Sequence, residues 1–179
     1  IPPEGSLFPS TYYFSKGIKK TKIIERMKRK MTNTLDLLWE ERRDNLKLHN
    51  KLEALILASI IEKETGISGE RKTISSVFHN RLNLNMRLQS DPTVTYGITE
   101  GFDLGRPLSK KDLRTPTAYN TYTIYGLPLT PIANPGLAAI EAALSPAQTD
   151  YLYFVSNGFG EHHFSKTLNQ HNKYVSELR

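Results

Sequence analysis

Three acidic side chains in the middle of the sequence are the first candidates for chemistry. Glu62 and Glu64 stand at the end of a long apolar run, and Asp91 comes directly before Pro92. A carboxyl group in apolar surroundings keeps its proton near neutral pH, because burial disfavours the charged form. Such a group can protonate the bridging oxygen of a glycosidic bond as a general acid. General acid catalysis on a sugar polymer is therefore one hypothesis for this region.

Helical geometry separates the two glutamates. Residues 50–66 predict a buried helix, with an Asn cap at the start, a Gly stop at the end and apolar side chains over most of the circumference. Two positions along a helix correspond to a rotation of about 200°, so Glu62 and Glu64 cannot serve the same site. Glu64 continues the apolar stripe of Ile60 and Ile61, which predicts the more apolar surroundings for Glu64.

A structural interpretation of the same residues stands beside the catalytic one. Both glutamates can be solvated at the helix end with Lys63 and Arg71 as partners, and the helix pattern alone favours this interpretation. Asp91 before a proline is typical of a turn acceptor.

A proline-rich stretch supplies further candidates. Residues 116–136 hold four of the ten prolines and predict a structured loop. Within it, Tyr119, Asn120 and Tyr122 fit either a platform for sugars or a strand edge packed on the body. The five histidines show no metal-ligand spacing and no Gly-rich phosphate loop occurs, so neither a metal site nor a cofactor is predicted.

The remaining pattern predicts an α+β domain in which several helices pack around short antiparallel strands. The length fits a single domain, 1–179, whose residues 1–17 form an extended segment. Residues 86–97 alternate apolar and polar positions and predict a strand, a turn and a second extended piece. Other helices are predicted at 21–39, at 68–83, at 135–145 and at 168–178. The third of these begins at Pro135 with Asn134 as its cap, and the last directs Leu168, Val175 and Leu178 inward. A hairpin is predicted from residues 151–155 and 162–165.

Positive charge is concentrated in one segment. Lys16 to Lys30 contains eight Lys or Arg residues and a single Glu, a local charge of +7 in a chain of net charge +6. A solvated helix face is the simpler interpretation, and an anionic surface such as lipid headgroups or nucleic acid is the alternative. No apolar run approaches the length of about eighteen residues that a membrane span needs.

Several motifs, taken in their order along the chain, closely resemble the endolytic murein transglycosylases of the YceG-like (MltG) family. The resemblance covers nearly the whole sequence, from EGSLFPSTYYF near the start to the last helix. The motifs are LASIIEKETG (57–66), SVFHNRL (76–82), MRLQSDPTVTYG (86–97), PTAYNTY (116–122), GLPLTPIANPG (126–136), YLYFV (151–155), HHFS (162–165) and HNKYV (171–175).

The resemblance implies the catalytic portion of a bacterial cell-wall enzyme. Members are normally anchored by an N-terminal helix in the cytoplasmic membrane and act on its extracytoplasmic face. A LysM-like part precedes the catalytic region, and residues 1–17 would connect to it. The implied partners are peptidoglycan glycan strands and peptidoglycan synthases, with no cofactor and no nucleic acid. A non-catalytic module that binds the cell wall or a partner protein is the alternative function.

The family's catalytic glutamate corresponds to Glu64. In the implied reaction Glu64 protonates the oxygen between MurNAc and GlcNAc, then takes the proton of the MurNAc C6 hydroxyl as that oxygen closes on C1. The product is a 1,6-anhydro end, which would terminate a nascent strand, and one carboxylate suffices where ordinary glycosidases use two. Arg81 is expected to pair either with a stem-peptide carboxylate or with Asp91. The residues expected to bind the sugars are Arg81, Gln89, Asp91, Tyr119, Asn120, Tyr122, His163 and Asn172.

Overall fold

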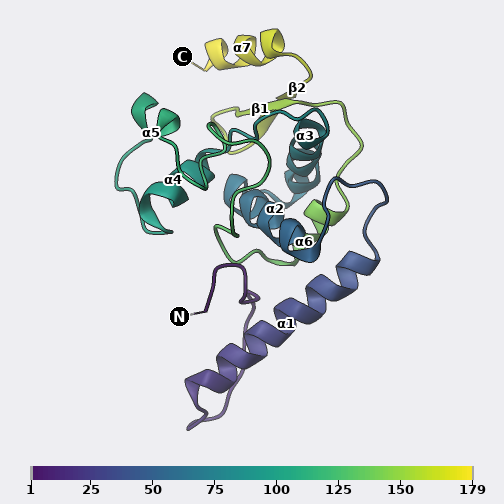
Figure 1. Cartoon of the computed structure of the whole chain (residues 1–179), viewed down its shortest axis with the longest axis vertical. Helices are drawn as coiled ribbons and strands as arrows, with labels where there is room; N and C mark the ends of the chain where they lie inside the picture. Colours follow the sequence, from purple (N-terminus) through teal and green to yellow (C-terminus); the bar gives the residue numbers. More distant parts are fainter. Residues whose placement is uncertain (1, 179) are drawn as a thin grey trace.

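The computed structural model describes residues 2–178, apart from the side chain of Ser68. Its fold is α+β, as predicted, and Figure 1 shows a small two-stranded hairpin at one end of the helical body. No helix in the described range is both long and apolar enough to cross a membrane. The elements are α1 (Lys20–Glu40), α2 (Lys51–Glu64), a 3-10 turn (Ser68–Glu70), α3 (Arg71–Asn83), α4 (Asp91–Thr99), α5 (Lys110–Arg114), α6 (Leu137–Leu144), β1 (Tyr153–Ser156), β2 (His162–Ser165) and α7 (Leu168–Glu177).

Helix α2 is the centre of the fold (Figure 1). Eight consecutive residues, 54–61, are buried, because α2 packs against α1, α3, α4 and α6. The predicted cap is present, since the Asn50 side chain accepts a hydrogen bond from the Glu53 N–H. The helix ends at Glu64, two residues before the predicted glycine stop, because Thr65 is extended. Glu64 is therefore the last helical residue.

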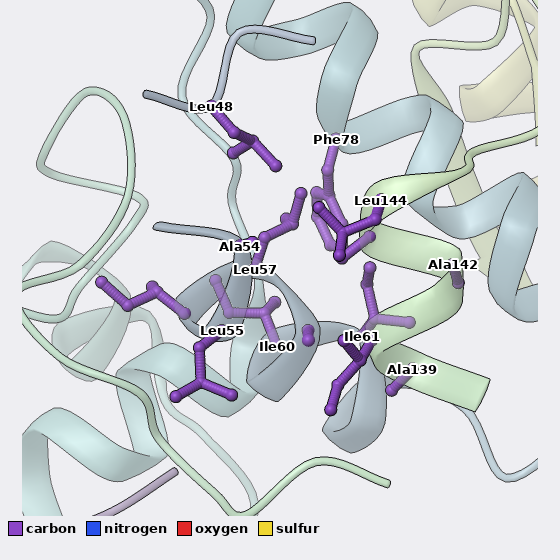
Figure 2. Close-up of a cluster of buried hydrophobic side chains, with 14 of the residues drawn as sticks. Leu48, Ala54, Leu55, Leu57, Ile60, Ile61, Phe78, Ala139, Ala142 and Leu144 are labelled. Carbon is purple, nitrogen blue, oxygen red and sulfur yellow. The ribbon is translucent and has the colours of Figure 1, made fainter. Parts of the chain in front are cut away.

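Helix α6 packs directly on α2 along a face of small side chains. Ala139, Ala142 and Ala143 are fully buried, and Figure 2 shows the first two among the core residues of both helices. The predicted cap of α6 is wrong, because the helix begins at Leu137 after an extended Gly136. The Asn134 side chain instead accepts a hydrogen bond from the Leu7 N–H at 2.8 Å, which ties the N-terminal segment to the core.

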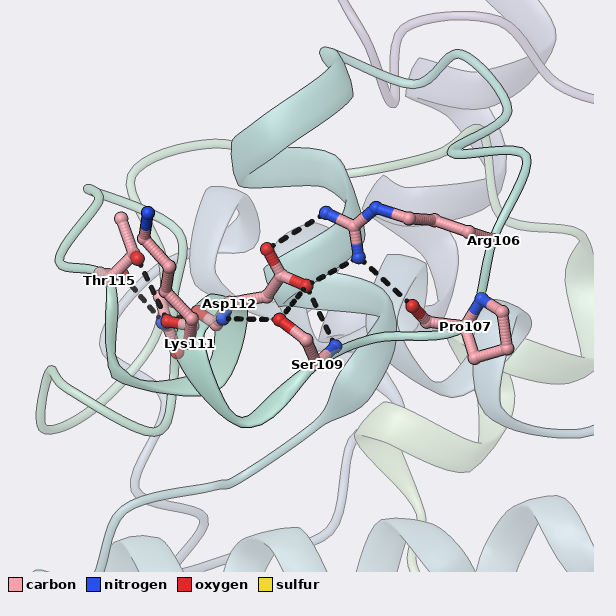
Figure 3. Close-up of polar contacts among 7 residues, drawn as sticks. Arg106, Pro107, Ser109, Lys111, Asp112 and Thr115 are labelled. Atoms are coloured by element: carbon pink, nitrogen blue, oxygen red, sulfur yellow. Dashed lines mark hydrogen bonds and ion pairs between the residues drawn. The ribbon is translucent and has the colours of Figure 1, made fainter.

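The predicted extended structure over residues 86–97 is wrong, because Asp91 begins helix α4. Pro92 lies in the first turn, where its missing N–H costs nothing. The short helix α5 was not predicted, and it follows a capping box between Ser109 and Asp112. Figure 3 shows the second support of this turn, the paired bonds from the Arg106 guanidinium to Asp112 at 2.6 and 3.1 Å.

The predicted hairpin is present, with β1 and β2 antiparallel and Phe154 opposite Phe164. Helix α7 packs on the outer side of the hairpin (Figure 1). The expectation that Leu168 and Leu178 point inward is wrong, because their side chains are 52% and 44% exposed. The hairpin offers α7 only a small surface to cover, so its apolar residues remain partly in solvent.

Helix α1 has the predicted amphipathic pattern. Met31 and Leu35 are buried against the body in its second half. Its first half, which carries most of the basic residues, extends away from the other helices (Figure 1).

Candidate active site

A cleft of about 480 Å³ opens at the C-terminal end of α2. It brings together Glu64 and four of the residues expected to bind sugars. Helices α2, α3, α4 and α7, the loop around 122 and the hairpin contribute its walls. The lining residues are Glu64, Arg81, Leu88, Gln89, Asp91, Tyr122, Tyr153, Phe154, Val155, Ser156, His162, Leu168 and His171.

The carboxyl of Glu64 is partly exposed in this cleft and holds its proton unusually well. Burial raises its pKa from 4.5 to about 7, and the nearby charge of Asp91 acts in the same direction. A hydrogen bond from the Ser90 hydroxyl, at 2.5 Å, and the positive charge of Arg81 act against this rise. Protonated and ionised forms are therefore both populated near neutral pH, so the group can give a proton and take one back.

Glu62 has a different environment. Its Oε2 accepts a hydrogen bond from the Gly136 N–H at 2.9 Å, at the start of α6. Its Oε1 lies 3.8 Å from the guanidinium of Arg71. The structural interpretation, with Arg71 as partner, therefore describes Glu62, whereas Glu64 faces the cleft.

The segment that carries Ser90 is held by the proline-rich loop. Gln89 adopts a left-handed backbone conformation, φ 53°, which a non-glycine residue keeps only when its surroundings fix it. The backbone N–H groups of Gln89 and Ser90 donate to the carbonyl and hydroxyl oxygens of Thr121, at 3.1 and 2.9 Å. Thr121 is fully buried, so the position of the Ser90 hydroxyl under Glu64 is set from the core side.

Asp91 and Tyr122 form a pair at the edge of the cleft. The Tyr122 hydroxyl donates to Asp91 Oδ1 at 2.6 Å. Burial, and then this bond to a carboxylate, raise the pKa of Tyr122 well above its ordinary value. Tyr122 therefore remains a donor at physiological pH, and it fixes an exposed carboxylate beside Glu64.

Arg81 joins three segments beneath the cleft. Its side chain is 7% exposed and donates to the carbonyl oxygens of Leu152, at 2.6 Å, and Leu88, at 2.8 Å. It also donates to the Gln89 side chain at 3.2 Å and lies over the ring of Tyr153. Arg81 makes these contacts rather than an ion pair with Asp91, which was one of its two expected partners, so it fixes the cleft wall. Its pairing with a stem-peptide carboxylate stays a prediction.

Two histidines that sequence reasoning missed line the opposite wall. His162 Nδ1 lies 2.7 Å from Glu70 Oε2, and its backbone N–H donates to Glu70 Oε1 at 2.9 Å. The His171 ring stacks on Tyr153 at 5.4 Å. Burial and the charge of Arg81 lower the pKa of His171, which favours the neutral ring.

The YceG-like family profile matches residues 2–177. The chain belongs to the YceG-like family. It is 43% identical over 173 residues to the endolytic murein transglycosylase of Bacillus subtilis (strain 168), which covers 96% of this chain and 47% of that protein. It is 32% identical over 179 residues to the endolytic murein transglycosylase of Streptococcus pneumoniae (strain R6). That alignment covers 97% of this chain and 32% of the Streptococcus protein.

A solved member of the YceG-like family has the same fold. The crystal structure of a YceG-like protein from Listeria monocytogenes superposes with a TM-score of 0.82 and 40% identity, over 94% of this chain and 54% of that one. The present chain thus spans between a third and about half of the length of the relatives it matches.

Four residues that the YceG-like motifs nominated as sugar ligands lie outside the cleft lining. Asn120 is fully buried, and its amide donates to the carbonyls of Leu113 and Thr115 while its oxygen accepts from the Tyr122 N–H. The expectation that Asn120 binds sugar is therefore corrected, because a buried amide with these partners shapes the loop instead.

The other three lie nearer the surface. The Tyr119 hydroxyl bonds with that of Thr130 at 3.0 Å. His163 points to the outer side of the hairpin, where its ring stacks on Tyr174 at 4.6 Å. Asn172 is exposed on α7. The wall is lined instead by His162, the sequence neighbour of His163, and by His171, the sequence neighbour of Asn172. Because side chains alternate between the two faces of a strand, His162 and His163 face opposite sides of the hairpin, and the two could have been told apart once the side that faces the cleft was known.

Proposed function

We propose that this chain is the catalytic part of an endolytic murein transglycosylase, cleaving the bond between MurNAc and GlcNAc and leaving a 1,6-anhydro end. One observation carries the proposal: Glu64 has a pKa near 7 and opens on a cleft of about 480 Å³. Family membership and the names of the Bacillus and Streptococcus relatives support it.

The reaction needs one proton donor that then becomes an acceptor. Protonated Glu64 gives its proton to the bridging oxygen, and the GlcNAc alcohol leaves. The resulting carboxylate takes the proton of the MurNAc C6 hydroxyl while that oxygen bonds to C1. Glu64 ends protonated as it began, and no water is consumed. A pKa of about 7 suits both steps, because neither form of the group is rare near neutral pH.

Asp91 has a supporting role in this scheme. Positive charge develops on the sugar ring as the bond breaks, and the carboxylate of Asp91 lines the same cleft as Glu64. Its bond from Tyr122 fixes its orientation before substrate binds, so its charge stabilises the transition state without reorganisation. Gln89 and Tyr122 bind sugar hydroxyl or acetamido groups at the same edge.

Family membership also supports a proposal for the location of the complete protein. We infer that it acts on glycan strands at the extracytoplasmic face of the bacterial cytoplasmic membrane, close to peptidoglycan synthases. An anchor and a LysM-like part would lie in the half or more of the relatives' length that this chain does not span.

Paired glutamate substitutions test the proposal. Glu64→Gln keeps the acceptor for Ser90 but removes the titrating proton, so cleavage of purified glycan strands should fall by about a hundredfold to ten-thousandfold. Glu62→Gln is the matched control on the same helix and should retain most of the activity, because Glu62 faces α6. The opposite ranking would overturn the assignment. Sedimentation with murein without any release of soluble fragments by the unsubstituted chain would favour a binding module instead.

A further inference from the structure

A second cavity, of about 300 Å³, lies next to the cleft along α4. The two hollows share Asp91, and Lys63, which directly precedes Glu64, lines the second one. Asp91 therefore lies at the boundary of the two cavities, and consecutive residues at the end of α2 line one cavity each. Besides these two residues, the second cavity is lined chiefly by Pro92, Thr95, Tyr96 and Phe102.

Phe102 is an aromatic ring held at the surface by a tight turn. Its side chain is 78% exposed. Helix α4 ends at Thr99 and is followed by Glu100 in the left-handed conformation, whose N–H donates to the Tyr96 carbonyl at 2.8 Å, and then by Gly101 at φ 97°. The Phe102 N–H then returns to the Thr99 carbonyl at 3.2 Å. Two successive left-handed residues thus turn the chain back over α4, and the exposed ring lines the same hollow as Tyr96.

The Tyr96 ring is braced from behind. It packs edge-on against Tyr119, with ring centroids 4.8 Å apart and an interplanar angle of 62°. The Tyr119 hydroxyl bonds with that of Thr130, so the Tyr119 ring that supports Tyr96 is itself held in place. The next residue, Gly97, lies so close to Thr117 that an added Cβ would clash with the threonine hydroxyl. One wall of the cavity is therefore rigid, and the other is an exposed ring.

We propose that this second cavity is a saccharide subsite, in which the rings of Phe102 and Tyr96 pack on the apolar face of a pyranose. Lys63 and the shared Asp91 bind its hydroxyl or acetamido groups. Ligand sites combine such apolar surfaces with a few polar groups, and the shared Asp91 makes this hollow a neighbour of the cleft that Glu64 lines. The inference rests on the proposed function, because a strand that is cut internally must continue past Glu64 in both directions.

Binding measured in the Glu64→Gln background tests the subsite without any cleavage. The probe is a peptide-free GlcNAc–MurNAc octasaccharide, titrated by calorimetry. Phe102→Ala should weaken its affinity by roughly two- to tenfold, the value expected for one aromatic contact, and Phe102→Trp should preserve it. Phe159→Ala is the control, because Phe159 is 93% exposed on the hairpin turn and lines neither cavity.

Amide chemical shifts provide a second readout. Titration of the octasaccharide should move the signals of Thr99, Gly101 and Phe102 and leave that of Phe159 in place. Unchanged affinity in Phe102→Ala, or no shift at these three amides, would overturn the subsite. A Phe102-dependent affinity in a chain that cleaves no glycan would instead reject the proposed function and leave the subsite standing.

Discussion

Glu64 is subject to two opposing influences on its proton affinity. Burial favours the neutral carboxyl and raises the pKa, whereas the hydrogen bond from Ser90 favours the carboxylate and lowers it. Burial is the larger effect, so the pKa is about 7. The Ser90 hydroxyl also fixes the rotamer of the acid, which matters because proton transfer requires a defined geometry.

The activity should therefore fall as pH rises through about 7, because the free chain then loses its general acid. Ser90→Ala removes the donor that favours the carboxylate, so this alkaline limb of kcat/KM should move to higher pH. Ser145→Ala, at an exposed position after α6, should leave the limb unchanged. Profiles of kcat/KM against pH for the three proteins measure the shift, and a limb that moves down in Ser90→Ala would contradict this role of the bond.

The same pKa links Glu64 to stability. The carboxyl titrates at 4.5 as a free side chain and at about 7 in the fold, so its favourable contribution is complete below pH 4.5 and is lost as pH rises through about 7. Glu64→Gln has no such loss. The stability of the variant relative to the unsubstituted chain should therefore increase by about 1 to 3 kcal/mol between pH 4.5 and pH 8.

Urea unfolding at both pH values measures this change in the free energy of unfolding. A stability difference between the two proteins that stays constant with pH would show that Glu64 titrates normally. This result is independent of any assay of activity.

At the scale of elements, the contact between α2 and α6 positions the acid. Helix α6 presents small side chains to its neighbours, and Glu62 of α2 accepts a bond at its first turn. This contact leaves the last residue of α2 at the cleft. The close approach depends on alanines such as Ala139, which is fully buried.

Ala139→Leu should destabilise the chain by about 1 to 3 kcal/mol, because a well-packed core has no room for the added carbons. The neighbouring Ala138 is exposed on the same helix, and Ala138→Leu should change the free energy of unfolding by less than about 0.5 kcal/mol. Denaturant unfolding of both variants makes the comparison. Equal effects at the two positions would contradict the close packing of α6.

Elements with strong local signals were predictable, and α4 shows the limit. Helix α2 has a cap and a continuous apolar body, so its start and type followed from the sequence. Helix α4 contains Thr93, Val94 and Gly97, which favour strand or turn by local propensity. Tertiary contacts decide its state, since Val94 is buried and the Thr93 hydroxyl bonds with that of Thr121 at 2.8 Å.

The choice among candidate site residues had a similar limit. The glutamate nominated by the family motif is the one that lies in the cleft. Between His162 and His163, however, only the register of the hairpin and the place of α7 determine which ring faces inward. Buried amides such as Asn120 look like ligands in a sequence, because their carbonyl partners are in no motif.

At the scale of the whole molecule, the cleft is assembled from distant parts of the chain. Glu64, Ser90 and Thr121 are linked by hydrogen bonds within the core, and the hairpin closes the opposite side. The basic first half of α1 lies apart from this assembly, across α2 from the hairpin (Figure 1). The net positive charge of the chain therefore arises from residues 16–30, which lie outside the cleft lining.

We propose that one carboxyl group, Glu64, cleaves glycan strands without water. Digestion of purified strands in water enriched in oxygen-18, followed by mass spectrometry of the new ends, tests it most directly. We expect 1,6-anhydro MurNAc ends that carry no oxygen-18. Reducing ends labelled with oxygen-18 would contradict it, since the chain would then be a hydrolase and Asp91 its second carboxylate.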